Sequence, residues 1–274
     1  MRLGIASSLK HESPEDWGKK MVAIGVKAVV FPVDFRAENE TITRYEKAAY
    51  NNDLLIAEVG VWRNPIAPDK KIREDALEYA IGQLKLADKI GARCCVNITG
   101  SMGERWDGAY KENFSSAAFK ASVESIQTII DAVKPTKTFY SIEPMPWMIP
   151  SDPDEYLKLL ATVDRAGFAV HMDICNWITS PNKYFFSAHF IKEAFTKLGK
   201  YIRSCHLKDV SLGEEFTFRL NETRCGGGSI DLEAYAEEAN RIDSDMPMLI
   251  EHLHGDDEYL TSLEYTAKRL NNWL

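Results

Sequence analysis

Short apolar runs alternate with longer amphipathic segments along the whole chain. Each run is rich in β-branched residues and lacks strict polar alternation, which is typical of a strand buried on both faces of a parallel sheet. The pattern therefore predicts strands at eight places, namely residues 3–7, 27–31, 54–59, 93–98, 138–143, 168–173, 201–206 and 248–252.

The segments between these runs carry helix signals. Proline follows a capping residue at Ser13-Pro14 and again within Ser151-Asp152-Pro153, as is common in the first turn of a helix. Ser229 or Asp231 is suited to cap a helix that runs towards residue 240. Residues 69–90 place apolar side chains at helical spacing on one face. Glycines that can end a helix in a left-handed turn precede several strands, at Gly25, Gly91, Gly167 and Gly199.

This alternation predicts a single α/β domain over residues 1–274, folded as a closed (β/α)8 barrel. Eight strands in 274 residues give a repeat of about 34 residues, the size of one strand–helix unit. An open doubly wound sheet is the alternative, but no GxGxxG turn follows any of the strands. Segments 99–114 and 208–228 are longer than ordinary connections, and long loops in compact domains are usually functional.

Composition excludes several classes of function. The formal charge of −8 argues against a protein that binds a nucleic-acid backbone. No apolar run approaches the length of about 18 residues that a membrane span needs. The first ten residues do not look like a signal peptide, and five cysteines without a CxxC pair favour reduced thiols. We therefore expect a cytoplasmic protein with a small-molecule partner.

Acidic residues and a histidine stand at the ends of the last four predicted strands. They are Glu143, Asp173, His206 and Glu251. The carboxyl ends of barrel strands meet at one face, so these side chains are expected to converge. Three carboxylates in one apolar place would repel one another strongly, and a divalent cation removes that repulsion. Mn²⁺, Co²⁺, Mg²⁺ and Zn²⁺ all accept carboxylate and imidazole ligands.

This four-residue pattern resembles the xylose-isomerase-like barrel superfamily, and the resemblance covers essentially the whole chain. That group includes sugar-phosphate isomerases and epimerases, ketose 3-epimerases, inosose isomerases and dehydratases, hydroxypyruvate isomerases and endonuclease IV. The resemblance implies one divalent metal ion, for which we expect Mn²⁺. It also implies that Glu143 and Glu251 both bind the metal and exchange protons with the substrate, with Asp173 and His206 as ligands only.

Departures from individual subfamilies narrow the choice. Endonuclease IV has further histidines for three metals, whereas Asn176 stands three residues after Asp173 here. Ketose 3-epimerases carry an arginine six residues after the metal histidine and a glutamate six residues after the first metal glutamate. This chain has Leu212 and Ile149 at those positions. The stretch His206-Leu-Lys-Asp looks more like the inosose-type enzymes.

A second resemblance points to a lyase. The stretch Glu-Pro-Met-Pro-Trp-Met-Ile-Pro at 143–150, with Asp-Ile-Cys-Asn at 173–176 and Ser-Pro at 180–181, is similar to the catalytic subunit of bacterial C-glycoside deglycosidases. Those enzymes cleave the C–C glycosidic bond of a 3-keto glycoside. The first hypothesis is thus a metal-dependent isomerase or epimerase of a sugar, cyclitol or sugar derivative. A metal-dependent lyase and a non-catalytic sugar-binding barrel are the alternatives.

Further residues are candidates for substrate binding. His171 shares a strand face with Asp173, although a core histidine fits the same position. Lys208 could meet a sugar oxygen or lie in a surface loop. Arg224 precedes three glycines whose N–H groups suit an anion, and a flexible lid is the other interpretation. The remaining candidates are Asn176 and the tryptophans of loops after strands, Trp62, Trp106, Trp147 and Trp177.

Other expectations concern neighbours of the site and partners. His252 alternates to the strand face opposite Glu251, so neither it nor His254 is expected to bind the metal. Cys175 and Cys205 are expected to pack in the core. A homo-oligomer or a small accessory subunit remains open, and the sequence does not locate an interface.

Overall fold

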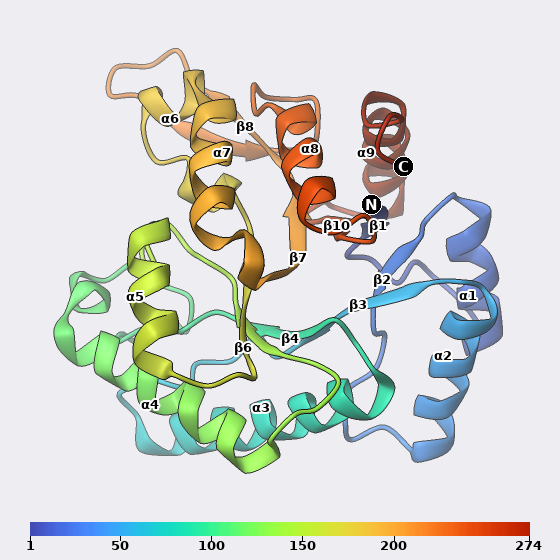
Figure 1. Ribbon diagram of the computed structural model, residues 1–274, viewed down its shortest axis with the longest axis horizontal. Coiled ribbons are helices and arrows are strands. Elements are labelled where there is room, and N and C mark those ends of the chain that lie inside the picture. Colours follow the sequence, from blue (N-terminus) through green and yellow to red (C-terminus); the bar gives the residue numbers. More distant parts are fainter.

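Eight parallel strands close into a barrel surrounded by helices in the computed structural model, which describes residues 1–274 (Figure 1). The barrel closes where β1 pairs with β10, from Arg2 opposite Pro247 to Ile5 opposite Ile250. The (β/α)8 prediction is confirmed, and each predicted strand is present within two residues of its expected ends. The strands are β1 (Arg2–Ile5), β2 (Ala28–Val30), β3 (Leu55–Gly60), β4 (Cys94–Asn97), β5 (Tyr140–Ile142), β6 (Phe168–Met172), β7 (Ile202–Leu207) and β10 (Pro247–Ile250).

The helices form the outer layer of the barrel. Their bounds are α1 (Pro14–Ala23), α2 (Asn39–Asn51), α3 (Lys70–Ile90), α4 (Ser116–Val133), α5 (Pro153–Val163), α6 (Pro181–Phe185), α7 (Ser187–Leu198), α8 (Leu232–Ile242) and α9 (Asp256–Arg269). The predicted caps of α1 and α5 are confirmed, because Ser13 and Asp152 each accept a hydrogen bond from a first-turn N–H group. Asp231, not Ser229, caps α8, and Ser229 instead accepts a hydrogen bond from the Tyr184 hydroxyl.

The glycine signals at helix ends are only half correct. Gly25 and Gly91 adopt left-handed φ angles of 85° and 68°, as predicted. Helix α5, however, ends at Asp164 in the left-handed region, three residues before Gly167. Gly199 keeps a helical φ of −47° because the chain continues into a short 3₁₀ turn before β7.

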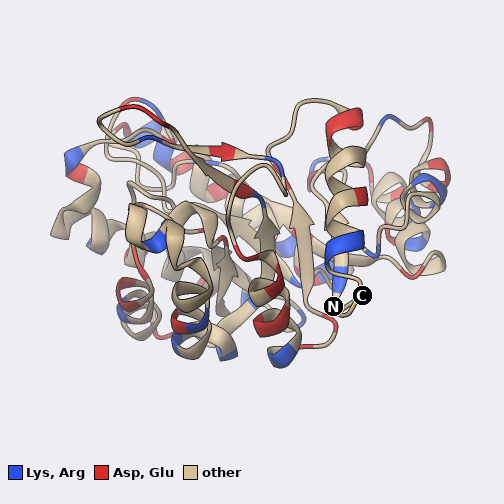
Figure 2. Ribbon diagram, turned by 90° about the horizontal axis from the view of Figure 1, so that it is seen from above, with Lys and Arg blue, Asp and Glu red and all other residues tan.

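The strands and the inner faces of the helices enclose a main hydrophobic core of 64 buried residues, and Ala28, Ala57 and Leu249 form a separate small cluster. All five cysteines are buried in the core region without a disulfide, as expected for reduced thiols. None of the helices has the length and apolar character needed to cross a membrane. Figure 2 shows basic and acidic residues interspersed along the outer helices.

The long segment after β7 contains structure that the hydrophobic pattern did not predict. It folds into an antiparallel hairpin of β8 (Asp209–Leu212) and β9 (Leu220–Thr223). The buried carboxylate of Asp209 accepts hydrogen bonds from four backbone N–H groups, those of Val210, Gly226, Gly228 and Ile230, at 2.8–3.1 Å. Two of the glycine N–H groups considered for an external anion are therefore occupied by the chain's own carboxylate. A Cβ at Gly228 would collide with the Val210 carbonyl oxygen, so this close approach requires glycine.

Candidate metal centre and active site

Four side chains from consecutive strands meet at the carboxyl end of the barrel. Glu143 follows β5, Asp173 follows β6, His206 lies on β7 and Glu251 follows β10. One ligand atom from each lies within 4.8 Å of the other three, and all four residues are at most 5% exposed. The structure thus brings together the four residues that the strand-end pattern singled out.

The donor atoms suit a divalent cation. His206 Nδ1 lies 2.9 Å from Glu251 Oε2 and 3.6 Å from Glu143 Oε1. His206 Nδ1 and Asp173 Oδ2 are buried yet make no hydrogen bond of good geometry. Each of these two atoms instead faces a charged side chain, Glu251 for His206 Nδ1 and Lys208 for Asp173 Oδ2, so charge rather than hydrogen bonding dominates in the cluster. Three carboxylates and one imidazole nitrogen form a set that could hold a metal ion.

The pKa shifts of the clustered side chains also indicate that the site needs positive charge. Burial raises the pKa of Asp173 well above its usual range, and Glu143 and Glu251 add to the rise. Burial would lower the pKa of His206, but the surrounding carboxylates Glu251, Glu58 and Glu143 raise it well above the usual value. Burial likewise opposes ionisation of Glu251, yet His206 and Lys208 hold its pKa well below the usual range. The cluster therefore retains protons and cations to balance its acids.

Lys208 supplies one of these charges from within the cluster. Its Nζ lies 2.6 Å from Glu251 Oε1 and 2.7 Å from Asp173 Oδ2, and the residue is only 2% exposed. Glu222 of β9 lies 3.5 Å from the same nitrogen. The surface-loop interpretation of Lys208 is wrong, because this residue directly after β7 is buried at the barrel mouth. Its ammonium group contacts two of the four candidate metal ligands.

Glu58 on β3 is a member of the site that the sequence reasoning did not single out. Its carboxylate accepts hydrogen bonds from His171 Nε2 at 2.7 Å and Ser204 Oγ at 2.6 Å, and it lies 3.2 Å from His206 Nε2. Burial would raise the pKa of Glu58, but His206 and His171 hold it below the usual range. The available signal was an acid inside an apolar strand, since a buried charge requires a partner.

His206 is consequently held from both sides of its ring. Nε2 faces Glu58, while Nδ1 faces Glu143 and Glu251. A carboxylate that accepts the distal N–H of a metal-binding histidine fixes the ring orientation and the tautomer. His171 is fully buried, packs against the His206 ring at a centroid distance of 4.1 Å and binds Glu58. This placement gives His171 a supporting contact behind His206, away from the mouth.

Asn176 lies directly against a candidate ligand. Its Nδ2 donates to Glu143 Oε1 and to the Pro144 carbonyl, each at 3.0 Å, and its backbone N–H donates to Asp173 Oδ1 at 3.3 Å. Asn176 also lines a cavity with Trp147 and Glu222. The residue is therefore placed both to orient Glu143 and to meet a ligand in the mouth.

The remaining candidates divide between mouth and core. Trp62 and Trp106 line a cavity of about 370 Å³ together with Glu58, His206 and Glu251. Arg224 lines a separate, polar cavity together with Glu222 and His252. Trp177 is fully buried and donates to the Pro150 carbonyl at 3.1 Å, so its predicted place on the mouth is wrong. The 3₁₀ turn after β6 directs this indole into the core.

His252 departs from the expected strand alternation. Strand β10 ends at Ile250, and His252 adopts a left-handed φ of 58°. Its ring therefore turns towards the site, with Nδ1 3.0 Å from Glu222 Oε1 and Nε2 3.5 Å from Glu251 Oε2. The prediction of an opposite face is wrong because the two-residue period ends with the strand.

Comparison with known proteins gives a consistent fold. Residues 19–269 match the model of the xylose isomerase-like TIM barrel family. A xylose isomerase-like TIM barrel protein from Mycobacterium smegmatis, in complex with magnesium, has a TM-score of 0.70 at 16% identity over 96% of this chain and 90% of that chain. D-psicose 3-epimerase from Clostridium cellulolyticum H10, with D-tagatose, has a TM-score of 0.71 at 15% identity over 98% and 99%.

A third similar structure is that of an epimerase named for a 3-keto-glucoside. The 3-keto-D-glucoside 4-epimerase from E. coli, in its apo form, has a TM-score of 0.71 at 12% identity over 98% of this chain and 99% of that chain. No curated protein matches the chain in sequence. At these identities the structural likeness shows the shared fold.

Proposed function

Because the chain belongs to the xylose isomerase-like TIM barrel family, we propose that it is a divalent-metal-dependent isomerase or epimerase of a sugar, cyclitol or sugar derivative. The observation that carries this proposal is the buried cluster of Glu143, Asp173, His206 and Glu251 at the barrel mouth. Such a cluster is costly to bury without a cation, and it lies where barrel enzymes place their chemistry. Sugar epimerases among the similar structures agree with this class of reaction.

Glu143 and Glu251 are the proposed acid and base. They extend from β5 and β10, with β6 and β7 between them in the barrel, so they reach the site from two sides. The cations around them lower the pKa of both carboxylates, which keeps both able to accept a proton. One carboxylate can then take a proton from a substrate carbon, and the other can return one. A bound divalent cation would polarise the adjacent carbonyl and so make that carbon more acidic.

The surrounding residues have supporting roles in this proposal. Asp173 and His206 complete the ligand set, and Mn²⁺ is the metal that we propose, ahead of Co²⁺, Mg²⁺ and Zn²⁺. Asn176 holds Glu143 through its amide. Lys208 would leave the carboxylates when a metal binds and offer its ammonium to a substrate oxygen. Trp62, Trp147 and Arg224 line the mouth cavities and would contact the sugar or groups attached to it.

Solvent exchange tests the proposal directly. The protein loaded with Mn²⁺ is incubated in D₂O with a panel of ketoses, inososes and 3-keto glycosides, and deuterium incorporation next to the carbonyl is followed by NMR. We expect exchange with at least one substrate, and its loss in Glu143→Gln. Glu124→Gln is the matched control, because Glu124 lies exposed on α4 in a surface ion pair with Lys120. Absence of exchange across the panel would rule the proposal out.

A lyase is the second candidate, and one feature of the site favours it. Ile149, which is buried, stands at the position of the glutamate of ketose 3-epimerases, and Leu212 of β8 stands at the position of their arginine. Apolar side chains thus replace two polar ones. A substrate other than a simple ketose fits this difference. Release of an aglycone from a 3-keto glycoside, dependent on Glu143, would favour the lyase over the isomerase.

A further inference from the structure

Lys208 has three carboxylates within ion-pair distance, and two of them are candidate metal ligands. Its Nζ lies 2.6 Å from Glu251 Oε1, 2.7 Å from Asp173 Oδ2 and 3.5 Å from Glu222 Oε2. Glu222 belongs to β9 and is not one of the four residues that could hold the metal. It is therefore the one carboxylate beside Lys208 that stays available once a cation occupies Asp173 and Glu251.

A bound metal ion leaves the Lys208 ammonium group in an unfavourable place. A divalent cation held by Asp173 and Glu251 repels an ammonium group that lies against the same two carboxylates. Lys208 is only 2% exposed, and a buried charge without a partner is strongly unfavourable. Lys208 consequently requires another anionic partner in the metal-bound protein.

The β8–β9 hairpin holds Glu222 next to Lys208. Strand β8 begins at Asp209, directly after Lys208, and Val210 of β8 stands opposite Glu222 of β9. The four N–H groups that bind the Asp209 carboxylate anchor the base of this hairpin. A movement of less than about 1 Å would bring Lys208 Nζ to the ~2.8 Å of a charge-assisted hydrogen bond with Glu222.

Glu222 also forms part of a cavity wall beside the metal cluster. It lines a cavity of about 410 Å³ together with Trp147 and Asn176, and Asn176 donates to the candidate ligand Glu143. Lys208 thus contacts the cluster on one side and a residue of this cavity on the other. An ammonium group has three N–H donors, so an ion pair with Glu222 leaves donors for a substrate oxygen.

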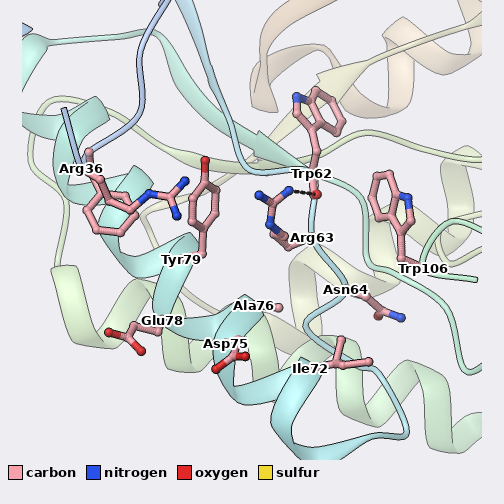
Figure 3. Close-up of a pocket in the computed structure, with 11 residues that line it drawn as sticks. Arg36, Trp62, Arg63, Asn64, Ile72, Asp75, Ala76, Glu78, Tyr79 and Trp106 are labelled. Carbon is pink, nitrogen blue, oxygen red and sulfur yellow. Dashed lines mark hydrogen bonds between the residues drawn. The ribbon is translucent and has the colours of Figure 1, made fainter. Parts of the chain in front are cut away.

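Other groups of the mouth do not offer Lys208 a comparable partner. His252 Nδ1 lies 3.3 Å from Lys208 Nζ, but the same nitrogen faces both carboxylate oxygens of Glu222 at 3.0 and 3.2 Å. The carboxylate of Glu78 lines a different cavity, over α3 and beside the loop of Trp62 that follows β3 (Figure 3). Three strands separate β3 from β7 in either direction around the barrel, so this cavity lies across the mouth from Lys208.

We propose that Glu222 is a positioning residue, which receives the Lys208 ammonium group when a divalent cation occupies Asp173 and Glu251. The ammonium group moves from the two metal ligands to the Glu222 carboxylate and stays in the barrel mouth. Glu222 thereby lowers the cost of metal binding and keeps Lys208 beside the substrate. This role rests on the proposed function, in which the four clustered residues bind a metal.

A double-mutant cycle measures the coupling between the two residues without a substrate. Mn²⁺ affinity is determined by calorimetry for the unmodified protein, Glu222→Gln, Lys208→Met and the double variant. Circular dichroism checks that each is folded, and the 41% exposure of the Glu222 side chain makes glutamine easy to accommodate. We expect Glu222→Gln to cost about tenfold more Mn²⁺ affinity in the presence of Lys208 than in the Lys208→Met background, a coupling typical of charges in contact.

The control for this cycle lies on the same hairpin. Glu214 is exposed in the loop between β8 and β9, and Glu214→Gln should leave the Mn²⁺ affinity unchanged. If Glu222 acted only as one more negative charge near the metal, its removal would cost the same affinity in both backgrounds. Equal losses with and without Lys208, or no loss in the unmodified background, overturn the proposal.

His252 requires its own variant because it contacts Glu222 and also lies 3.5 Å from Glu251. Asparagine tolerates the left-handed φ of 58° at this position, so His252→Asn is the suitable replacement. The coupling between Lys208 and Glu222 should persist in His252→Asn. Its disappearance there would mean that Glu222 acts through His252, which overturns the proposal.

The NMR signal of the Lys208 ammonium group reports on its partner directly. The protein carries isotope-labelled lysine, Mg²⁺ replaces the paramagnetic Mn²⁺, and the signal is assigned by its absence in Lys208→Met. An ammonium group held in a buried ion pair exchanges its protons slowly enough to be observed. We expect the signal in both metal-free proteins, and its loss on addition of Mg²⁺ in Glu222→Gln but not in the unmodified protein. Retention of the signal in Mg²⁺-loaded Glu222→Gln, or its loss in the Mg²⁺-loaded unmodified protein, overturns the proposal.

Deuterium exchange, measured on the same samples, separates the role of Glu222 from the proposed reaction. Coupling between Lys208 and Glu222 without any exchange contradicts the isomerase and leaves the positioning role standing. Exchange without coupling contradicts the positioning role alone. Absence of Mn²⁺ binding by the unmodified protein contradicts both.

Discussion

Replacement of Glu58 by glutamine probes how the barrel orients its metal-binding histidine. In the native chain one carboxylate oxygen, Oε1, accepts from His171 and Ser204, and the other, Oε2, faces His206 Nε2 at 3.2 Å. Glutamine has nearly the same shape but only one acceptor oxygen. That oxygen continues to accept hydrogen bonds from His171 Nε2 and Ser204 Oγ, so the amide N–H₂ group of the glutamine faces His206.

The expected effect follows from the tautomer of His206. Two donors cannot face one another, so Nε2 becomes the acceptor and the ring proton moves to Nδ1. Nδ1 is the nitrogen that faces Glu143 and Glu251, and a protonated nitrogen cannot bind a metal. Loss of such a supporting carboxylate typically costs about 10- to 100-fold in metal affinity. That range corresponds to about 1.4–2.7 kcal/mol of binding free energy.

The assay combines metal titration with spectroscopy. Mn²⁺ affinity is measured by calorimetry for the unmodified protein, Glu58→Gln and the surface control Glu124→Gln. The visible spectrum of bound Co²⁺ reports whether the nitrogen ligand is retained, a feature that a mere change in stability does not alter. Circular dichroism establishes that each variant is folded. Unchanged Mn²⁺ affinity and an unchanged Co²⁺ spectrum in folded Glu58→Gln would refute the reasoning.

Three further predictions concern other charges. Lys208→Met should tighten Mn²⁺ binding about tenfold or more in a calorimetric titration, because the substitution removes the ammonium group that competes with the metal for Asp173 and Glu251. Weaker Mn²⁺ binding in this variant would contradict the prediction. Asp209→Ala should lower the free energy of unfolding in urea by about 3 kcal/mol, because four buried N–H groups lose their acceptor; a loss no larger than that of a surface Asp→Ala variant would oppose it. Burial opposes ionisation of Asp88, but hydrogen bonds from the Thr136 and Lys137 N–H groups hold its pKa below the usual value in the folded state. The stabilisation by Asp88 is therefore present above pH ~4 and is lost as the pH falls through the folded pKa. The difference in the free energy of unfolding between the unmodified protein and Asp88→Ala should accordingly decrease in unfolding curves measured at acidic pH.

The sequence alone determined the barrel and the four strand-end residues. Buried parallel strands appear as apolar runs, and their carboxyl ends lie on one side by topology. Glu143, Asp173, His206 and Glu251 could thus be placed together without knowledge of any distance. Local capping chemistry likewise placed the starts of α1 and α5, since a cap depends only on residues within one helical turn.

Tertiary structure decided what surrounds these four residues. Glu58 meets His171 and His206 across the barrel interior, from positions 113 and 148 residues away in sequence. Trp177 leaves the mouth because the 3₁₀ turn after β6, not strand periodicity, sets its direction. Lys208 lies two positions beyond His206, but only the structure shows that its ammonium group is buried between Asp173 and Glu251. Periodicity assigns a side chain to a face, but only the closed barrel determines which side chains from distant strands share that face.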